Sequence, residues 1–230
     1  MPIVIDENLD PSLYPLAWLV GAWEGTGAVQ LKGENGEEVG HAIEQHLTVT
    51  PNSAKGLTWV MRTWVLDSPA PEPPTSAFYE KGEEGSDASQ QSTDTTLVRE
   101  LLLEEKGTWR TTGVLPGQDE EAAKNAKPGS PESYLSHGVS LTMERSSAFG
   151  EAPAEHWAGE VRGPRIQLAT QDLAASSGAA GRDDSHGARM FGLVGGRLMW
   201  LQEVGSSLSN LRPYLSVELN RAADEDVKEA

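Results

Sequence analysis

The chain has 230 residues, 35 of them acidic and 18 basic, which gives a formal net charge of −17 at pH 7. This charge argues against binding to nucleic acid or to an anionic membrane surface, because both depend on clustered lysine and arginine. The sequence holds no cysteine, which excludes disulfides, thiolate metal sites and a cysteine nucleophile. Its N-terminus lacks a signal-peptide pattern, and no run reaches the ~18 apolar residues of a membrane helix, so we expect a cytoplasmic protein.

Short runs of alternating apolar and polar residues follow one another along the chain, separated by glycine and proline, and predict β-strands. Before them, residues 11–20 are predicted to form at most a short helical turn. The run 188–204 is interpreted as two strands joined at Gly195-Gly196, because a two-residue hairpin turn requires positive φ angles. The predicted strands lie at 17–27, 41–50, 56–66, 76–80, 95–104, 107–115, 134–144, 155–162, 164–170, 188–204 and 213–221.

Three segments between these runs hold too few apolar residues to order themselves. They are predicted to be flexible insertions at 68–94, 116–131 and 174–186. The polar tail 224–230 is expected to be disordered. We find no internal repeat, and we therefore expect one domain over 1–230, with the barrel described next at about 14–222.

The fold follows from the number of strands. About ten antiparallel strands in an open sheet would leave long unpaired edges, and closure of the sheet removes them. We therefore predict an all-β fold with a single closed or nearly closed antiparallel β-barrel, of the lipocalin and fatty-acid-binding-protein type. A barrel of this size encloses more space than its side chains fill, which predicts an internal cavity for a ligand.

A glycine-rich motif opens the first predicted strand. Gly21, Trp23, Gly25 and Gly27 form the pattern G-x-W-x-G-x-G. A large indole at this place is suited to close one end of a barrel, and the glycines allow close approach of the backbone and strong curvature of the strand.

Three later stretches complete a resemblance to a known family. They lie at 154–170, 197–204 and 208–221. Together with the glycine motif they resemble, in the same order, the nitrobindin family of ten-stranded barrels, and the resemblance covers roughly residues 14–221. It implies haem b bound through a histidine of the closing segment, chemistry on nitric oxide, and isomerisation of peroxynitrite to nitrate. Barrels of this kind can also form homodimers through an outer sheet face.

The sequence departs from this family at the haem ligand. Tyr214 occupies the position that matches the family's axial histidine, and the family's haem-side threonine has no counterpart in 29–36. We therefore expect a nitrobindin-like barrel that cannot ligate haem in the usual way, with no bound cofactor, an unknown small ligand and no assigned catalytic residue. Alternation within 213–221 puts Leu215 on one face and Tyr214 and Ser216 on the other, without indicating which face is interior.

Two alternatives stay open. In the first, the protein is a ferric haem protein that handles nitric oxide or peroxynitrite, with Tyr214 or another histidine as ligand. Tyrosinate ligates ferric haem in catalases, although a phenol has an ordinary pKa of ~10.

In the second alternative, the barrel carries a fatty acid or another small apolar ligand. Such a site pairs arginine with the ligand carboxylate, and Arg62, Arg99 and Arg189 lie in predicted strands. With Trp200 they are the candidate cavity residues. We predict no metal site, because no two histidines have metal-ligand spacing, and we expect each histidine to be a partly exposed or hydrogen-bonded strand residue.

Overall fold

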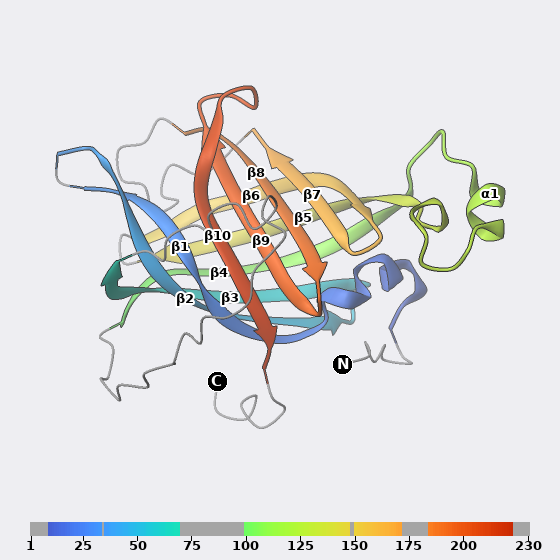
Figure 1. Ribbon diagram of the computed structural model, residues 1–230, viewed down its shortest axis with the longest axis horizontal. Coiled ribbons are helices and arrows are strands. Elements are labelled where there is room, and N and C mark those ends of the chain that lie inside the picture. The colour runs from blue at the N-terminus through green and yellow to red at the C-terminus, as the bar shows by residue number, and fades with distance from the viewer. Residues whose placement is uncertain (1–8, 34, 70–98, 148–149, 172–183, 223–230) are drawn as a thin grey trace, which may run out of the picture.

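The computed structural model describes residues 9–33, 35–69, 99–147, 150–171 and 184–222. Ten antiparallel strands form one closed barrel, in which each strand pairs with its neighbours in sequence and β1 also pairs with β10 (Figure 1). The predicted all-β closed barrel is thereby confirmed. The strands are β1 (Gly21–Lys32), β2 (Glu38–Asn52), β3 (Gly56–Pro69), β4 (Arg99–Val114), β5 (Ser136–Ser147), β6 (Gly150–Arg162), β7 (Arg165–Thr170), β8 (His186–Val194), β9 (Arg197–Gly205) and β10 (Leu211–Arg221).

Helical structure among these residues is short. The 3₁₀ helix η1 (Pro11–Leu19) occupies the segment predicted to form a helical turn, and α1 (Glu120–Asn125) and η2 (Pro131–Ser133) lie between β4 and β5. The insertion predicted at 116–131 thus contains a helix. Asp119 caps the N-terminus of α1 by accepting a hydrogen bond from the Ala122 backbone nitrogen at 2.8 Å, which stabilises this short helix. No helix in the described part of the chain is long and apolar enough to cross a membrane.

Some sequence predictions differ from the structure and others lie outside its described part. Of the runs 95–104 and 107–115, predicted as two strands, the parts from Arg99 to Val114 belong to the single strand β4, since Gly107 pairs with both β3 and β5 instead of forming a turn. The hairpin at Gly195-Gly196 is confirmed, with φ angles of 60° and 83°. The predicted strand 76–80, the tail 224–230, and most of the insertions 68–94 and 174–186 lie outside the described residues.

The glycine motif closes the barrel where β1 meets β10. A Cβ atom on Gly25 would lie 2.1 Å from the carbonyl oxygen of Glu218, and one on Gly27 would lie 2.1 Å from that of Ser216. Only glycine permits this approach of the two strands. Trp23 follows the expected role of a plug, because it is buried and its indole N–H donates to the Leu19 carbonyl at 2.8 Å.

The barrel has two distinct ends. At the η1 end, helix η1 buries Leu13, Leu16 and Leu19 against the barrel, and the odd-numbered strands begin. At the opposite end, which we call the distal end, the even-numbered strands begin, including β10. The two ends differ in the side chains that they bring into the interior, and this difference positions the candidate site.

Candidate functional site

Inward side chains form layers along the barrel axis, because every second residue of each strand faces the interior. Nearer the η1 end they are aromatic. Trp59, Trp109 and Phe191 pack edge to face with ring centroids 5.5 to 5.7 Å apart, and Trp200 stacks on Phe191 at 5.4 Å. Each such pair adds ~0.5–1.5 kcal/mol beyond burial of its area, so this half of the interior is a packed core.

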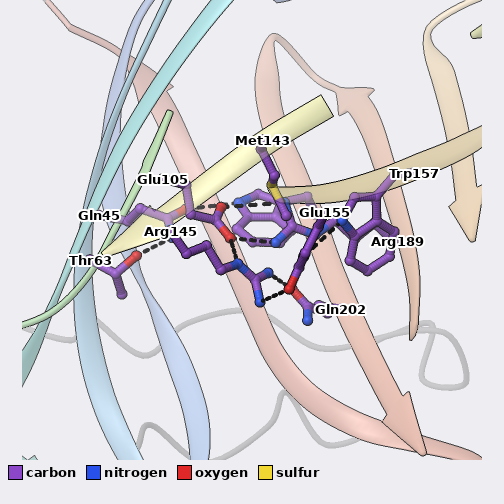
Figure 2. Close-up of polar contacts among 10 residues, drawn as sticks. Gln45, Thr63, Glu105, Met143, Arg145, Glu155, Trp157, Arg189 and Gln202 are labelled. Carbon is purple, nitrogen blue, oxygen red and sulfur yellow. Dashed lines mark hydrogen bonds and ion pairs between the residues drawn. The ribbon is translucent and has the colours of Figure 1, made fainter. Parts of the chain in front are cut away.

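Nearer the distal end the inward side chains become polar and charged. Such residues are rarely buried unless they are paired, yet here each has at most 3% of its surface exposed. These residues lie on seven different strands, and their side chains converge in the interior (Figure 2). We call this set the polar layer, and it comprises Gln45, Thr63, Glu105, Arg145, Glu155, Arg189 and Gln202.

Glu105 binds both arginines of the polar layer. Its Oε1 accepts hydrogen bonds from Arg145 Nε at 2.7 Å and from Arg189 Nη2 at 2.6 Å, and its Oε2 accepts one from Arg189 Nη1 at 3.3 Å. Arg145 also donates to Glu155 at 3.0 Å (Figure 2). The layer therefore contains two arginines and two glutamates whose formal charges cancel.

Amide side chains connect this ion-pair network to its neighbours. The Gln202 Oε1 atom accepts hydrogen bonds from Arg189 Nε at 3.1 Å and Arg145 Nη2 at 3.4 Å. Gln45 accepts one from the Trp200 indole at 2.8 Å. The Gln202 Nε2 atom is buried and has no hydrogen-bond partner among the described residues. One donor in the layer is thus left for an acceptor that the described residues do not supply.

The pKa shifts reflect a balance between burial and pairing. Burial raises the pKa of Glu105, but the guanidinium groups of Arg189 and Arg145 outweigh it and hold this pKa below its ordinary value. Burial lowers the pKa of Arg145, but Glu105, Glu155 and Tyr214 outweigh it, and the net pKa is raised. Burial, helped by the like charge of Arg145, leaves the pKa of Arg189 lowered. Glu105 and both arginines are therefore ionised at neutral pH.

Arg189, a candidate partner for a ligand carboxylate, is inside the barrel, but its guanidinium already contacts other side chains of the interior. Its guanidinium lies over the rings of Trp157 and Trp200, at 4.7 and 5.3 Å from their centroids, and contacts the Met143 sulfur at 3.5 Å. Its charge is matched by Glu105. Trp200, the other interior candidate, packs in the aromatic core. The polar layer consequently offers a fatty-acid carboxylate no unmatched cation.

The prediction that Arg62 and Arg99 line the cavity is wrong. Both lie on the outer surface, where their side chains are 42% and 48% exposed. Arg62 binds Glu104 at 2.7 Å, and Arg99 binds Glu44 at 2.7 Å while covering the ring of Trp64. The sequence alone does not distinguish these two arginines from Arg189, because the alternation of a strand does not indicate which of its two faces is interior.

Tyr214 occupies a β-bulge near the start of β10. Pro213 pairs with Glu203 and Leu215 pairs with Gln202, so that the strand register shifts at Tyr214. A bulge of this kind places two residues opposite one and re-aims a side chain.

The bulge also breaks the alternation expected for β10. Tyr214 and Leu215 are both buried, at 4% and 5% exposure, whereas Ser216 is exposed. The prediction that Tyr214 shares a face with Ser216 is therefore wrong. Tyr214 also lies close enough to the polar layer to interact electrostatically with Arg145, and this interaction raises the pKa of the arginine. The structure thus brings a phenol to the distal-end side of the buried ion pairs.

The histidines occupy scattered positions. His41 pairs in register with Val29, which is fully buried, so His41 falls on the inner face near the distal end. His46 and His156 are exposed, and His137 lies where β5 begins at the η1 end. Over the described ranges, no group of three or more His, Asp or Glu side chains could hold a metal ion.

Sequence reasoning missed the polar layer, although a signal for it exists. Glu105 lies in the same alternation as Leu103 and Trp109, and Arg145 follows Met143 in the same way. A charged residue at a strand position where the alternation predicts an inward, apolar side chain indicates a buried charge. An acidic residue at such a position on one strand and a basic residue on another indicate a buried ion pair. The complete burial of Glu105 agrees with this signal.

Comparison with known proteins identifies similar chains over nearly the whole length. Residues 12–221 match the family model of the "THAP4-like, heme-binding beta-barrel domain". The chain is 27% identical over 223 residues to a peroxynitrite isomerase of Paenarthrobacter aurescens (strain TC1), covering 97% of this chain and 100% of that protein. It is 28% identical over 232 residues to a ferric nitrobindin-like protein of Beutenbergia cavernae, with 97% and 100% coverage.

A solved structure shares the fold. The crystal structure of Rv2717c from M. tuberculosis superposes with a TM-score of 0.51 at 16% sequence identity, covering 94% of this chain and 100% of that chain. At this identity the likeness concerns the barrel architecture alone.

Proposed function

Because this chain belongs to the nitrobindin family of THAP4-like, heme-binding beta-barrel domains, we propose that it binds ferric haem at the distal end, with the Tyr214 phenolate as iron ligand. The observation that carries this proposal is the bulge in β10, which buries Tyr214 next to the charge of Arg145. Val29, Ile43 and Val204 are buried, inward and nearer the same end. They belong to the hydrophobic core, and an apolar lining with few polar groups would suit a large flat ligand.

The donor chemistry fits ferric iron. A buried phenol stays protonated unless a positive charge or a hydrogen bond favours its anion. Arg145 supplies one such charge, and a ferric ion at the phenol oxygen would supply another. Tyrosinate is an established ligand of ferric haem. The exchange of histidine for tyrosine therefore changes the kind of ligand at this position and keeps a donor there.

The Gln202 amide gives a second point of fit. Its Nε2 is a buried donor without a partner in the described chain, and such an orphaned donor costs ~1–3 kcal/mol. Gln202 faces Leu215 directly beside the bulge. A phenolate at Tyr214, or an oxyanion bound next to it, would provide the missing acceptor.

The activity that follows is the isomerisation of peroxynitrite, which the names of several relatives state for those proteins; the family resemblance of the sequence implies nitrate as the product. When bound, ferric haem supplies the electrophilic iron for this rearrangement. The protein's own residues would hold the cofactor through Tyr214, exclude water with the apolar wall, and keep the anionic ligand charged through Arg145. Phenolate ligation favours the ferric state, so we expect weak binding of nitric oxide to a ferrous form.

A haemin titration of the purified chain tests the proposal. We expect saturation at one equivalent, read from the Soret band, and an affinity at least tenfold lower in Tyr214→Phe, since loss of one metal–ligand bond costs well over 1.4 kcal/mol. The matched variant Tyr214→His restores the family's donor in the same bulge and should retain binding with a histidine-type spectrum. Equal affinity of the wild type and Tyr214→Phe would contradict Tyr214 ligation.

A second candidate function is a barrel that has lost haem and binds a neutral apolar ligand. The charge-balanced polar layer favours it, because no arginine of that layer remains for a ligand carboxylate. The same titration separates the two functions. Haemin binding by Tyr214→His but not by the wild type would show that the tyrosine abolished cofactor binding.

A further inference from the structure

Arg212, at the start of β10, faces the interior at the distal end. It pairs in register with Val204 of β9, and Val204 is 3% exposed and belongs to the hydrophobic core. Residues directly opposite each other in paired strands share one face of the sheet. Arg212 therefore lies on the inner face, two residues before Tyr214 and nearer the end of the barrel.

The Arg212 guanidinium binds carboxylates from two other parts of the barrel. Nη1 and Nη2 donate to the two oxygens of Asp184 at 2.9 and 2.8 Å, and Nε donates to Glu38 at 2.8 Å. Glu38 begins β2, which lies beyond β1, and Asp184 precedes β8, which lies beyond β9. One guanidinium thus joins carboxylates from both sides of β10, in the paired geometry that arginine favours.

Arg212 differs from the arginines of the polar layer in its access to solvent. The side chains of Arg145 and Arg189 are at most 2% exposed. The side chain of Arg212 is 37% exposed and that of its partner Glu38 is 39% exposed, whereas that of its other partner Asp184 is only 9% exposed. A carboxylate that leaves an exposed pair is solvated at little cost, whereas one that leaves a buried pair is not. Of the two partners of Arg212, Glu38 is therefore the one that can be exchanged.

We propose that Arg212 is the binding residue for a carboxylate group of the barrel's ligand, and that Glu38 holds this position until the ligand displaces it, while Asp184 keeps the guanidinium in place. The inference rests on the proposed function for the place of the ligand, and it is independent of iron ligation. A porphyrin propionate fits, because the Nε side of the guanidinium already holds one exposed carboxylate. The exchange replaces one charge-assisted pair by another, and Glu38 passes into water.

Metal-free protoporphyrin IX and its dimethyl ester are the probes for this site, with fluorescence as the readout. They have the same ring and differ in the two carboxylates, and neither contains iron. We expect the full-length wild type to bind the acid about tenfold more tightly than the ester, the range of one charge-assisted interaction. Arg212→Gln should remove this preference. Glu38→Gln should increase affinity for the acid about threefold, because it frees the Nε side of Arg212 for the ligand.

Arg197→Gln is the matched control, since it makes the same charge change at an exposed arginine near the η1 end, where Arg197 pairs with Glu218. It should leave both affinities unchanged. Equal binding of acid and ester by the wild type, or shifts of the same sign in Arg212→Gln and Glu38→Gln, would overturn the inference. The acid-over-ester preference for the metal-free probes reports on the carboxylates alone and the haemin titration reports on iron ligation, so failure of the Arg212 site and failure of iron ligation are told apart.

Discussion

The Glu105 carboxylate and the Arg189 guanidinium meet at 2.6 Å in the middle of the barrel, and neither side chain is exposed to solvent. Arg145 and Glu155 extend this pair into a neutral group of four charges. Ion pairs of this kind contribute little net stability compared with apolar residues, but removal of one partner leaves an uncompensated buried charge. The barrel interior therefore depends on the group remaining complete.

The first prediction concerns the loss of Glu105. Glu105→Ala leaves Arg189 and Arg145 without their shared carboxylate, and we expect the free energy of unfolding to fall by ~3–5 kcal/mol. The neighbouring Glu104→Ala is the control, because Glu104 faces outward and pairs with Arg62 and Lys106 at the surface. It should cost about 1 kcal/mol or less. Urea denaturation measures both changes, and equal losses would place Glu105 outside a buried network.

The second prediction is a pH dependence of stability. The pKa of Glu105 lies below its ordinary value of 4.5, because Arg189 and Arg145 outweigh the effect of burial. A carboxylate whose pKa is lowered on folding contributes stability that is fully present above the unfolded value and lost as the pH falls through the folded value. The stability difference between wild type and Glu105→Gln should thus stay constant from about pH 7 to pH 5 and shrink below about pH 4.5.

Urea titrations at several pH values measure this difference directly. A difference that stays constant down to the acid limit of the folded state would show that Glu105 does not change its ionisation on unfolding.

The third prediction tests how β1 and β10 close the barrel. A Cβ atom on Gly25 would lie 2.1 Å from a backbone oxygen of β10, and the strands would have to separate. We expect Gly25→Ala to cost ~1–3 kcal/mol or more. In Gly192→Ala, on β8, the nearest neighbour of the new Cβ is the Pro164 carbonyl oxygen at 3.9 Å, so stability should stay the same or rise slightly. Thermal unfolding of both variants tests the contrast, and equal melting temperatures would contradict it.

Much of the fold was predictable because its determinants are local. Alternating apolar residues and glycine turns predict strands without reference to distant parts of the chain, as at Gly195-Gly196. The error at Gly107 has a tertiary cause, since the flanking strands β3 and β5 hold this glycine within β4.

The candidate site was harder to predict because it depends on register. Arg62 and Arg189 lie in equally plausible strands, and only the closed barrel shows that one is outside and the other inside. The position of Tyr214 depends on a single extra residue in β10, where the register to β9 shifts. One such bulge reverses the alternation that sequence reasoning relies on. The resemblance in sequence located this residue, and the geometry supplied its orientation.

The most direct test of Tyr214 as iron ligand is a comparison of visible absorption and resonance Raman spectra of the haemin-loaded wild type, Tyr214→Phe and Tyr214→His proteins. Phenolate bound to ferric iron gives a charge-transfer absorption and enhanced tyrosinate vibrations. We predict both in the wild type and neither in the two variants, with a histidine-type spectrum in Tyr214→His. A wild-type spectrum that stays unchanged in Tyr214→Phe would contradict ligation by Tyr214 and direct attention to His41 on the same inner face.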